Sequence, residues 1–129
     1  MDGENGLLKK ANEAFYRAFE LLDIERMGRV WDTTEEIQCI HPGWNLLQGW
    51  TAVRDSWEGI FKNTKYMEFR ITYSSAHISG DLGYIICVEN ITSSYGGPAS
   101  ENSILATNIF RKRNGLWKII HHHGSPLLE

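Results

Sequence analysis

Two histidines near the end of the 129-residue sequence, His121 and His123, are the residues best suited to chemistry. One residue separates them, so on a strand both side chains point to the same face. Histidine gains and loses a proton near neutral pH, so the pair could carry protons for a ligand or donate hydrogen bonds to it. Two other interpretations are open: core histidines bonded to protein groups, or ligands of a metal ion that His41 completes. No carboxylate or thiolate is clearly placed to complete such a site, and neither a metal nor a cofactor is expected.

A second group of candidate site residues surrounds the turn at Pro42-Gly43. His41 ends a short predicted strand just before this turn, where a side chain can either project into the mouth of a cavity or cap the turn. Trp44 follows the turn, and Trp57 lies on the aromatic face of a predicted helix. Both indoles could stack on a ligand or belong to the core.

The hairpin turn predicted at Asn114-Gly115 decides which residues share a face with the histidines. If the two strands pair without interruption from this turn, Asn108 lies opposite His121. The more apolar face of the hairpin, which carries Trp117, is the one expected under the helices. Asn108, His121 and His123 are therefore predicted to point inward, where they would line a pocket.

The other face of the same hairpin carries Leu105, Ile109 and Ile120. A face in contact with water would not favour three such side chains. We expect this outer face to pack against a second copy of the chain, which makes a homodimer the predicted assembly.

The remaining elements follow from hydrophobic spacing and turn residues. Apolar residues recur at helical spacing from Leu7 to Leu22, and a second short helix is expected after the N-cap Asp23. A third amphipathic helix follows Thr51, its predicted N-cap. Strands are expected at 37–41, 66–78, 82–92, 104–113 and 116–123. Helices first and consecutive antiparallel strands afterwards indicate an α+β fold.

Length and composition limit the class of protein. The length indicates one domain over residues 1–129, with a core from about 7 to 126. Thirteen basic and sixteen acidic residues, without a basic run, argue against a nucleic-acid partner. Cys39 and Cys87 lie in apolar runs and are expected to be reduced, buried thiols of a cytoplasmic protein. Residues 1–6 are polar and acidic, and the sequence lacks an apolar stretch long enough to span a bilayer, so neither export nor a membrane anchor is expected.

Three segments resemble the SnoaL-like branch of the nuclear transport factor 2-like (NTF2-like) superfamily. They are Cys39-Ile40-His41-Pro42-Gly43-Trp44, the stretch from Gly49 to Trp57, and the stretch from Asn114 to Pro126. The closing strand is also similar to that of the association domain of calcium/calmodulin-dependent kinase. The resemblance implies an α+β cone, in which N-terminal helices pack on a curved, mostly antiparallel sheet and enclose a pocket. It also implies a dimer through the outer sheet face.

The resemblance implies a pocket for a small apolar molecule and leaves the activity open. The superfamily includes ketosteroid isomerases, polyketide cyclases and dehydratases, but also non-catalytic association and scaffold modules. Its isomerases and cyclases use an inward carboxylate as base, whereas the predicted inward positions of the last two strands hold Asn108, His121 and His123. One alternative is acid and base work by His41, His121 and His123 on a carbonyl-containing ligand, assisted by Tyr16, Tyr84 or Asp32. The other is a scaffold that forms a dimer or a ring.

Overall fold

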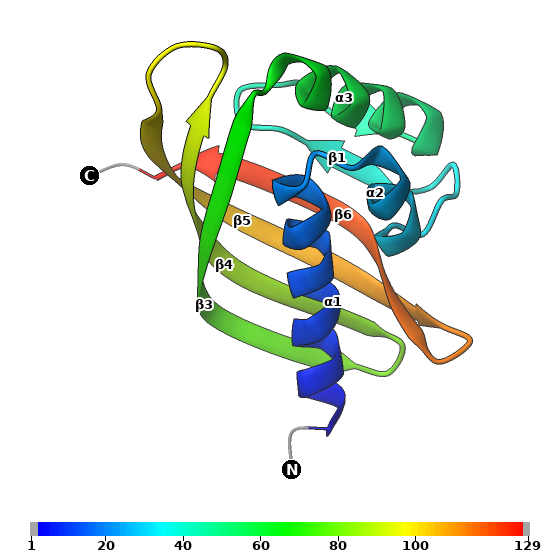
Figure 1. The fold of residues 1–129 in the computed structure, drawn as a ribbon. Helices are drawn as coiled ribbons and strands as arrows, with labels where there is room; N and C mark the ends of the chain where they lie inside the picture. Colours follow the sequence, from blue (N-terminus) through cyan, green and yellow to red (C-terminus); the bar gives the residue numbers. More distant parts are fainter. Residues whose placement is uncertain (1–2, 128–129) are drawn as a thin grey trace.

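The computed structural model describes residues 3–127, which form three helices and one six-stranded sheet (Figure 1). The helices are α1 (Gly3–Glu20), α2 (Ile24–Val30) and α3 (Trp50–Asn63). Asp23 caps α2 as predicted, since its carboxylate accepts hydrogen bonds from the backbone N–H groups of Glu25 and Arg26. The N-cap of α3 is Gly49, so the prediction of Thr51 is wrong. Gly49 has a φ of 87°, a value that glycine adopts without steric cost.

The sheet combines an antiparallel meander with one parallel pair. Its strands are β1 (Gln38–Ile40), β2 (Leu47–Gln48), β3 (Tyr66–Ser79), β4 (Leu82–Ser94), β5 (Ser100–Arg113) and β6 (Leu116–Pro126). Their order across the sheet is β2-β1-β6-β5-β4-β3. The antiparallel pairing from β3 to β6 is confirmed. The parallel pairing of β1 with β6 joins segments far apart in the sequence and brings Cys39 beside His122.

The β5–β6 hairpin begins as predicted. Asn114 and Gly115 have φ values of 51° and 79°, and a two-residue type I′ turn requires this left-handed backbone at both positions. Arg113 pairs with Leu116, and the predicted pairing continues to Phe110 and Ile119. Beyond that pair, the register shifts by one residue at Ile120.

This β-bulge makes the predicted register wrong from Ile120 onward. Asn108 lies opposite His122, not His121, and Thr107 lies opposite His123. The extra residue turns every later side chain of β6 to the other face, because side chains alternate along a strand. His122 therefore points toward the helices and is 2% exposed, whereas His121 and His123 lie on the opposite face. The predicted inward orientation of His121 and His123 is wrong for this reason.

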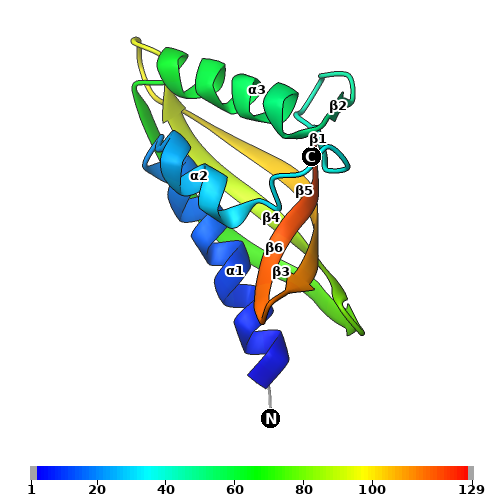
Figure 2. The ribbon, with the colours of Figure 1, turned by 90° about the vertical axis from the view of Figure 1, so that its right-hand side faces the viewer.

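The core lies between the helices and one face of the sheet. Figure 2 shows the helices on that side of the sheet. The centre of the core is aromatic: the ring of Trp57 in α3 lies 4.7 Å from that of Phe19 and 5.7 Å from that of Phe15, both in α1. Edge-to-face contacts of this kind favour a fixed arrangement of the rings. They hold α1 and α3 on one face of the sheet, where α1 packs mainly on β3 and also on β6 and β4, and α3 packs on β1 and β2. The predicted α+β cone is confirmed. The limits predicted for the domain, residues 1 and 129, lie outside the described residues, as does part of the polar N-terminal segment. The single-domain organisation remains a prediction.

Candidate functional site

A cavity of about 540 Å³ lies between α3 and the inner face of the sheet. This volume is in the range that accommodates a small organic ligand. Its apolar wall includes Phe19, Ile60, Met67, Ile91 and Ile104. Its buried polar side chains include His41, Ser56, Glu89 and His122. Trp44 and Tyr95 also line it from two loops and are 48% and 66% exposed. An apolar cavity onto which a few polar groups converge is the candidate functional site of this chain.

Glu89 on β4 is the buried acid of this cavity. It belongs to the inward row of the strand, two residues after Cys87, and is 3% exposed. The hydroxyl of Tyr16, from α1, donates a hydrogen bond of 2.5 Å to its Oε2. Burial raises the pKa of the Glu89 carboxyl to about 7, although the hydrogen bond from Tyr16 opposes the shift. A carboxyl with this pKa is well suited to exchange a proton near neutral pH.

His122 lies next to Glu89 but does not form an ion pair with it. Its Nδ1 is 2.6 Å from Oδ1 of Asn108, and its Nε2 is 4.0 Å from Oε2 of Glu89. Burial holds the pKa of His122 well below its usual value, so the imidazole is neutral at physiological pH. The ring packs 5.1 Å from that of Phe15 and 5.9 Å from that of Trp57.

His41 follows β1 and reaches the same cavity from the other side. Its Nε2 is 2.9 Å from the hydroxyl oxygen of Ser56, which in turn donates to the carbonyl oxygen of Val53 at 2.6 Å. Because the Ser56 proton is used in that bond, Nε2 of His41 donates to Ser56. Burial lowers the pKa of His41 to about 4, so it too is neutral at physiological pH. Its ring lies edge-on to those of Trp44 and Trp57, at 4.8 and 4.6 Å.

Both cysteines are free and buried, as predicted. The Cys87 sulfur lies 3.5 Å from the Tyr16 hydroxyl, and burial raises the pKa of the thiol to about 11. Burial raises the pKa of Cys39 as well. Neither thiol is ionised at neutral pH, so neither offers a reactive thiolate to the cavity.

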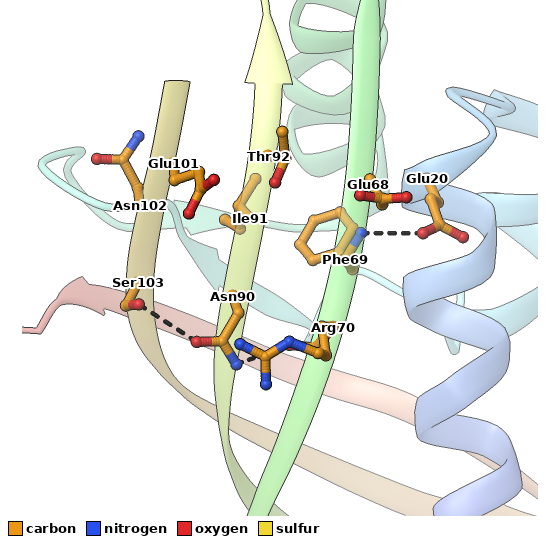
Figure 3. Close-up of a pocket in the computed structure, with 10 residues that line it drawn as sticks. All are labelled: Glu20, Glu68, Phe69, Arg70, Asn90, Ile91, Thr92, Glu101, Asn102 and Ser103. Atoms are coloured by element: carbon orange, nitrogen blue, oxygen red, sulfur yellow. Dashed lines mark hydrogen bonds between the residues drawn. The ribbon is translucent and has the colours of Figure 1, made fainter. Parts of the chain in front are cut away.

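A larger groove of about 880 Å³ lies over β3, β4 and β5 (Figure 3). Its hydrogen bonds join Ser103 to Asn90 at 3.3 Å, Asn90 to the carbonyl of Arg70 at 2.8 Å, and Glu20 to the backbone N–H of Phe69 at 2.9 Å. The ionisable side chains that line this groove are exposed or half-buried. The smaller cavity is the better candidate, because buried polar side chains converge on it.

Some of the predicted site residues meet at the cavity. His41 and Trp44 line it, and Asn108 and Tyr16 lie directly behind Glu89 and His122. Trp57 is fully buried in the aromatic core, in contact with the His41 ring. The binding or catalytic roles of these residues remain predictions.

The other predicted site residues lie on the outer face of the sheet. Tyr84 is 40% exposed and stacks on His77 at 5.1 Å. His121 contacts Oε1 of Gln38 through Nδ1 at 3.3 Å, and His123 is exposed. The sheet therefore separates these two histidines from His41, so the three cannot share a metal ion. Among residues 3–127, no cluster of three or more His, Cys, Asp or Glu side chains could hold one.

The sequence reasoning missed Glu89, His122 and Ser56. Glu89 lies in a strand in which both alternating rows are apolar, since Ile86 and Val88 face outward as Ile85 and Cys87 face inward. Alternation alone therefore did not reveal which row was buried. The signal that could have found Glu89 is an acid in an otherwise apolar strand.

Within the described residues, the helices are too short or too polar to cross a membrane.

Comparisons with known proteins agree with the fold. The profile of the SnoaL-like domain family matches residues 8–129. The chain is 34% identical to a proposed dehydratase of the NTF2-like family from Streptomyces avermitilis, with a TM-score of 0.92 and 99% of each chain covered. It is 30% identical to a proposed calcium/calmodulin-dependent protein kinase type II association domain from Thiobacillus denitrificans, with a TM-score of 0.84 over 93% of this chain and 94% of that one.

A plant protein shares part of the sequence. The chain is 27% identical over 117 residues to the F-box protein SKIP8 of Arabidopsis thaliana, an alignment that covers 91% of this chain and 48% of that protein. The chain thus spans about half the length of this curated relative.

Proposed function

The chain belongs to the SnoaL-like domain family of the NTF2-like superfamily, and on this premise we propose that its cavity binds a small, largely apolar molecule and exchanges a proton with it. The observation that carries the proposal is Glu89, a buried carboxyl with a pKa of about 7 that lines a cavity of ligand size. The proposed dehydratase from Streptomyces avermitilis, similar over its whole length, supports a reaction of this class.

The ionised form of Glu89 is the proposed base. Hydrogen bonds among the described residues reach its Oε2 from Tyr16, and none reaches Oε1. Oε1 is therefore available to a ligand. With a ligand that carries a carbonyl group, Oε1 would take the proton from the neighbouring carbon, and the electron pair of the broken C–H bond would move onto the carbonyl oxygen. A buried carboxylate is a stronger base than one in water, because water does not stabilise its charge. Glu89 thus takes the role that the sequence assigned to inward histidines.

A proton-abstraction probe tests the proposal without knowledge of the natural ligand. When a base removes the ring proton of 5-nitrobenzisoxazole, the N–O bond breaks, a nitrile forms and a coloured phenolate is released. We expect kcat/KM for this reaction to rise with pH to a plateau above about 7, because the ionised form of Glu89 is the base. Glu89→Gln removes that base and is expected to lower kcat/KM by roughly 10² to 10⁴.

Glu68→Gln is the matched control, because Glu68 is an exposed carboxylate outside the cavity. Its kcat/KM is expected to equal that of the wild type. Equal rates for the wild type and Glu89→Gln, or a rate independent of pH between 5 and 9, would contradict the role of Glu89.

We also propose a second function, association between copies of this chain. On the outer sheet face, Leu105 is 38% exposed and Ile109 is partly exposed, while Ile120 in the bulge is half-buried against the core. The outward row of β4 adds two further apolar side chains, Ile86 and Val88. The 30% identity to a proposed association domain favours a second copy as the partner of this face. The two functions are compatible, since they use opposite faces of the sheet.

A further inference from the structure

A buried chain of hydrogen bonds joins Glu89 to His122. It runs from Glu89 to Tyr16 at 2.5 Å, from Tyr16 to Asn108 at 3.1 Å, and from Asn108 to His122 at 2.6 Å. Asn12 of α1 also belongs to this network, since its Oδ1 accepts a hydrogen bond from Nδ2 of Asn108 at 2.8 Å. Asn108 and Asn12 are fully buried, so water does not compete for these bonds.

The hydrogen bonds of this buried chain all donate in one direction, from His122 toward Glu89. The Tyr16 hydroxyl donates its only proton to Glu89, so its oxygen can only accept from Asn108. Asn108 therefore turns Nδ2 toward Tyr16 and Asn12, and Oδ1 toward His122. An amide oxygen accepts and never donates, so Nδ1 of His122 must carry the hydrogen.

The direction of the chain leaves Nε2 of His122 with a free lone pair. His122 is buried and neutral, and a neutral imidazole carries one hydrogen, which is already on Nδ1. Nε2 lies 4.0 Å from Oε2 of Glu89, too far for a hydrogen bond between them. Both residues line the cavity, and 4.0 Å between these atoms is short enough for one ligand atom to contact both.

We propose that Asn108 makes this cavity selective for a hydroxyl group, by holding Nε2 of His122 as an acceptor beside the Glu89 carboxyl. A ligand hydroxyl donates its hydrogen to Nε2 and accepts one from the protonated carboxyl. A ketone oxygen accepts a hydrogen bond from the carboxyl but has no hydrogen to donate to Nε2, which then stays buried without a partner. Asn108 is a positioning residue, because it acts through His122. The inference rests on the cavity of the proposed function and narrows its ligand class to compounds in which a hydroxyl group accompanies the carbonyl group of the proposed reaction.

The tautomer of His122 tests the role of Asn108 in the ligand-free protein. In long-range ¹H–¹⁵N spectra of histidine-labelled protein, we expect the wild type to show His122 with hydrogen on Nδ1. Asn108→Leu removes the acceptor and is expected to move the hydrogen toward Nε2, the commoner tautomer of free histidine. Thr107→Val, on the same strand but the other face, is the matched control and is expected to leave the spectrum of His122 unchanged. Hydrogen on Nε2 in the wild type would overturn the inference even if Asn108→Leu failed to fold.

Ligand selectivity is measured by calorimetry with 1-tetralol and 1-tetralone, which share a skeleton and differ in the oxygen group. An unpaired buried acceptor weakens binding by about ten- to a hundredfold, so the wild type is expected to prefer tetralol by this factor. In Asn108→Leu the ratio is expected to approach one. Equal affinity of the wild type for the two compounds would overturn hydroxyl selectivity, while turnover of 5-nitrobenzisoxazole through Glu89 would leave the proposed function standing. Failure of both compounds to bind, together with no such turnover, would overturn the proposed function, and the tautomer would still decide the role of Asn108.

Discussion

Three consecutive histidines of β6 lie in two different environments. His122 is 2% exposed on the inner face, bonded to Asn108 and beside Glu89. His121 and His123 lie on the outer face, where their rings are 6.4 Å apart. The residue type is the same, so the difference comes from the face that each side chain occupies. One extra residue in the strand decides that assignment.

The two faces also differ in what burial does to ionisable groups. On the inner face, burial keeps His122 and His41 neutral and raises the pKa of Glu89 to about 7. On the outer face, partial burial lowers the pKa of His121, with a smaller effect from the neighbouring His123. Proton exchange near neutral pH is therefore expected from the inner carboxyl and not from the inner histidines.

The largest expected effect is on stability, and it separates the histidines of the two faces. We expect His122→Ala to lower the free energy of unfolding by about 4 kcal/mol, because it leaves a cavity in the core and the buried Asn108 oxygen without a donor. His123→Ala, at an exposed position of the same strand, is expected to change it by less than about 0.5 kcal/mol. Urea unfolding of the two variants measures the difference. Similar losses in both would show that the faces are not distinct in the way the bulge implies.

The pH dependence of stability tests the inner face separately. His41 has a pKa of about 4 when folded, below the usual 6.5, so the unfolded chain binds protons more tightly. The contribution of neutral His41 to the free energy of unfolding is fully present above about pH 6.5 and is lost as the pH falls through 4. The loss is about 3 kcal/mol. His41→Gln keeps a donor for Ser56 and does not titrate. Between pH 7.5 and pH 4, its free energy of unfolding is therefore expected to fall by about 3 kcal/mol less than that of the wild type. Parallel pH profiles for the variant and the wild type, from unfolding curves at each pH, would rule out this assignment.

The sequence was sufficient for the elements that local signals determine. Helical spacing and the Asp23 cap gave the helices, and Asn114-Gly115 gave the last hairpin, because a two-residue turn with left-handed backbone strongly favours this pair. These signals depend on residues close together in the chain. They also carried the resemblance to the SnoaL-like family.

The candidate site depends on relations that a single sequence does not display. The bulge at Ile120 has no glycine or other local mark, so uninterrupted pairing was the natural assumption and placed His121 and His123 inside. Glu89 was missed because both rows of β4 are apolar, and the parallel pairing of β1 with β6 joins segments about 80 residues apart. Each failure concerns register or long-range pairing, which tertiary contacts decide.

The smallest effect on the stability of the single chain is expected from a substitution on the outer face of the sheet. If a second copy covers this face, Leu105→Asp places a charge in the contact and is expected to turn a dimer into a monomer in sedimentation equilibrium. The stability of the single chain is expected to change by less than about 1 kcal/mol, because Leu105 is already 38% exposed. Leu116→Asp, at the β5–β6 turn and 58% exposed, is the matched control and is expected to stay dimeric. A monomeric wild type, or a dimer that survives Leu105→Asp, would mean that the outer face differs from the inner one in chemistry without serving as an interface.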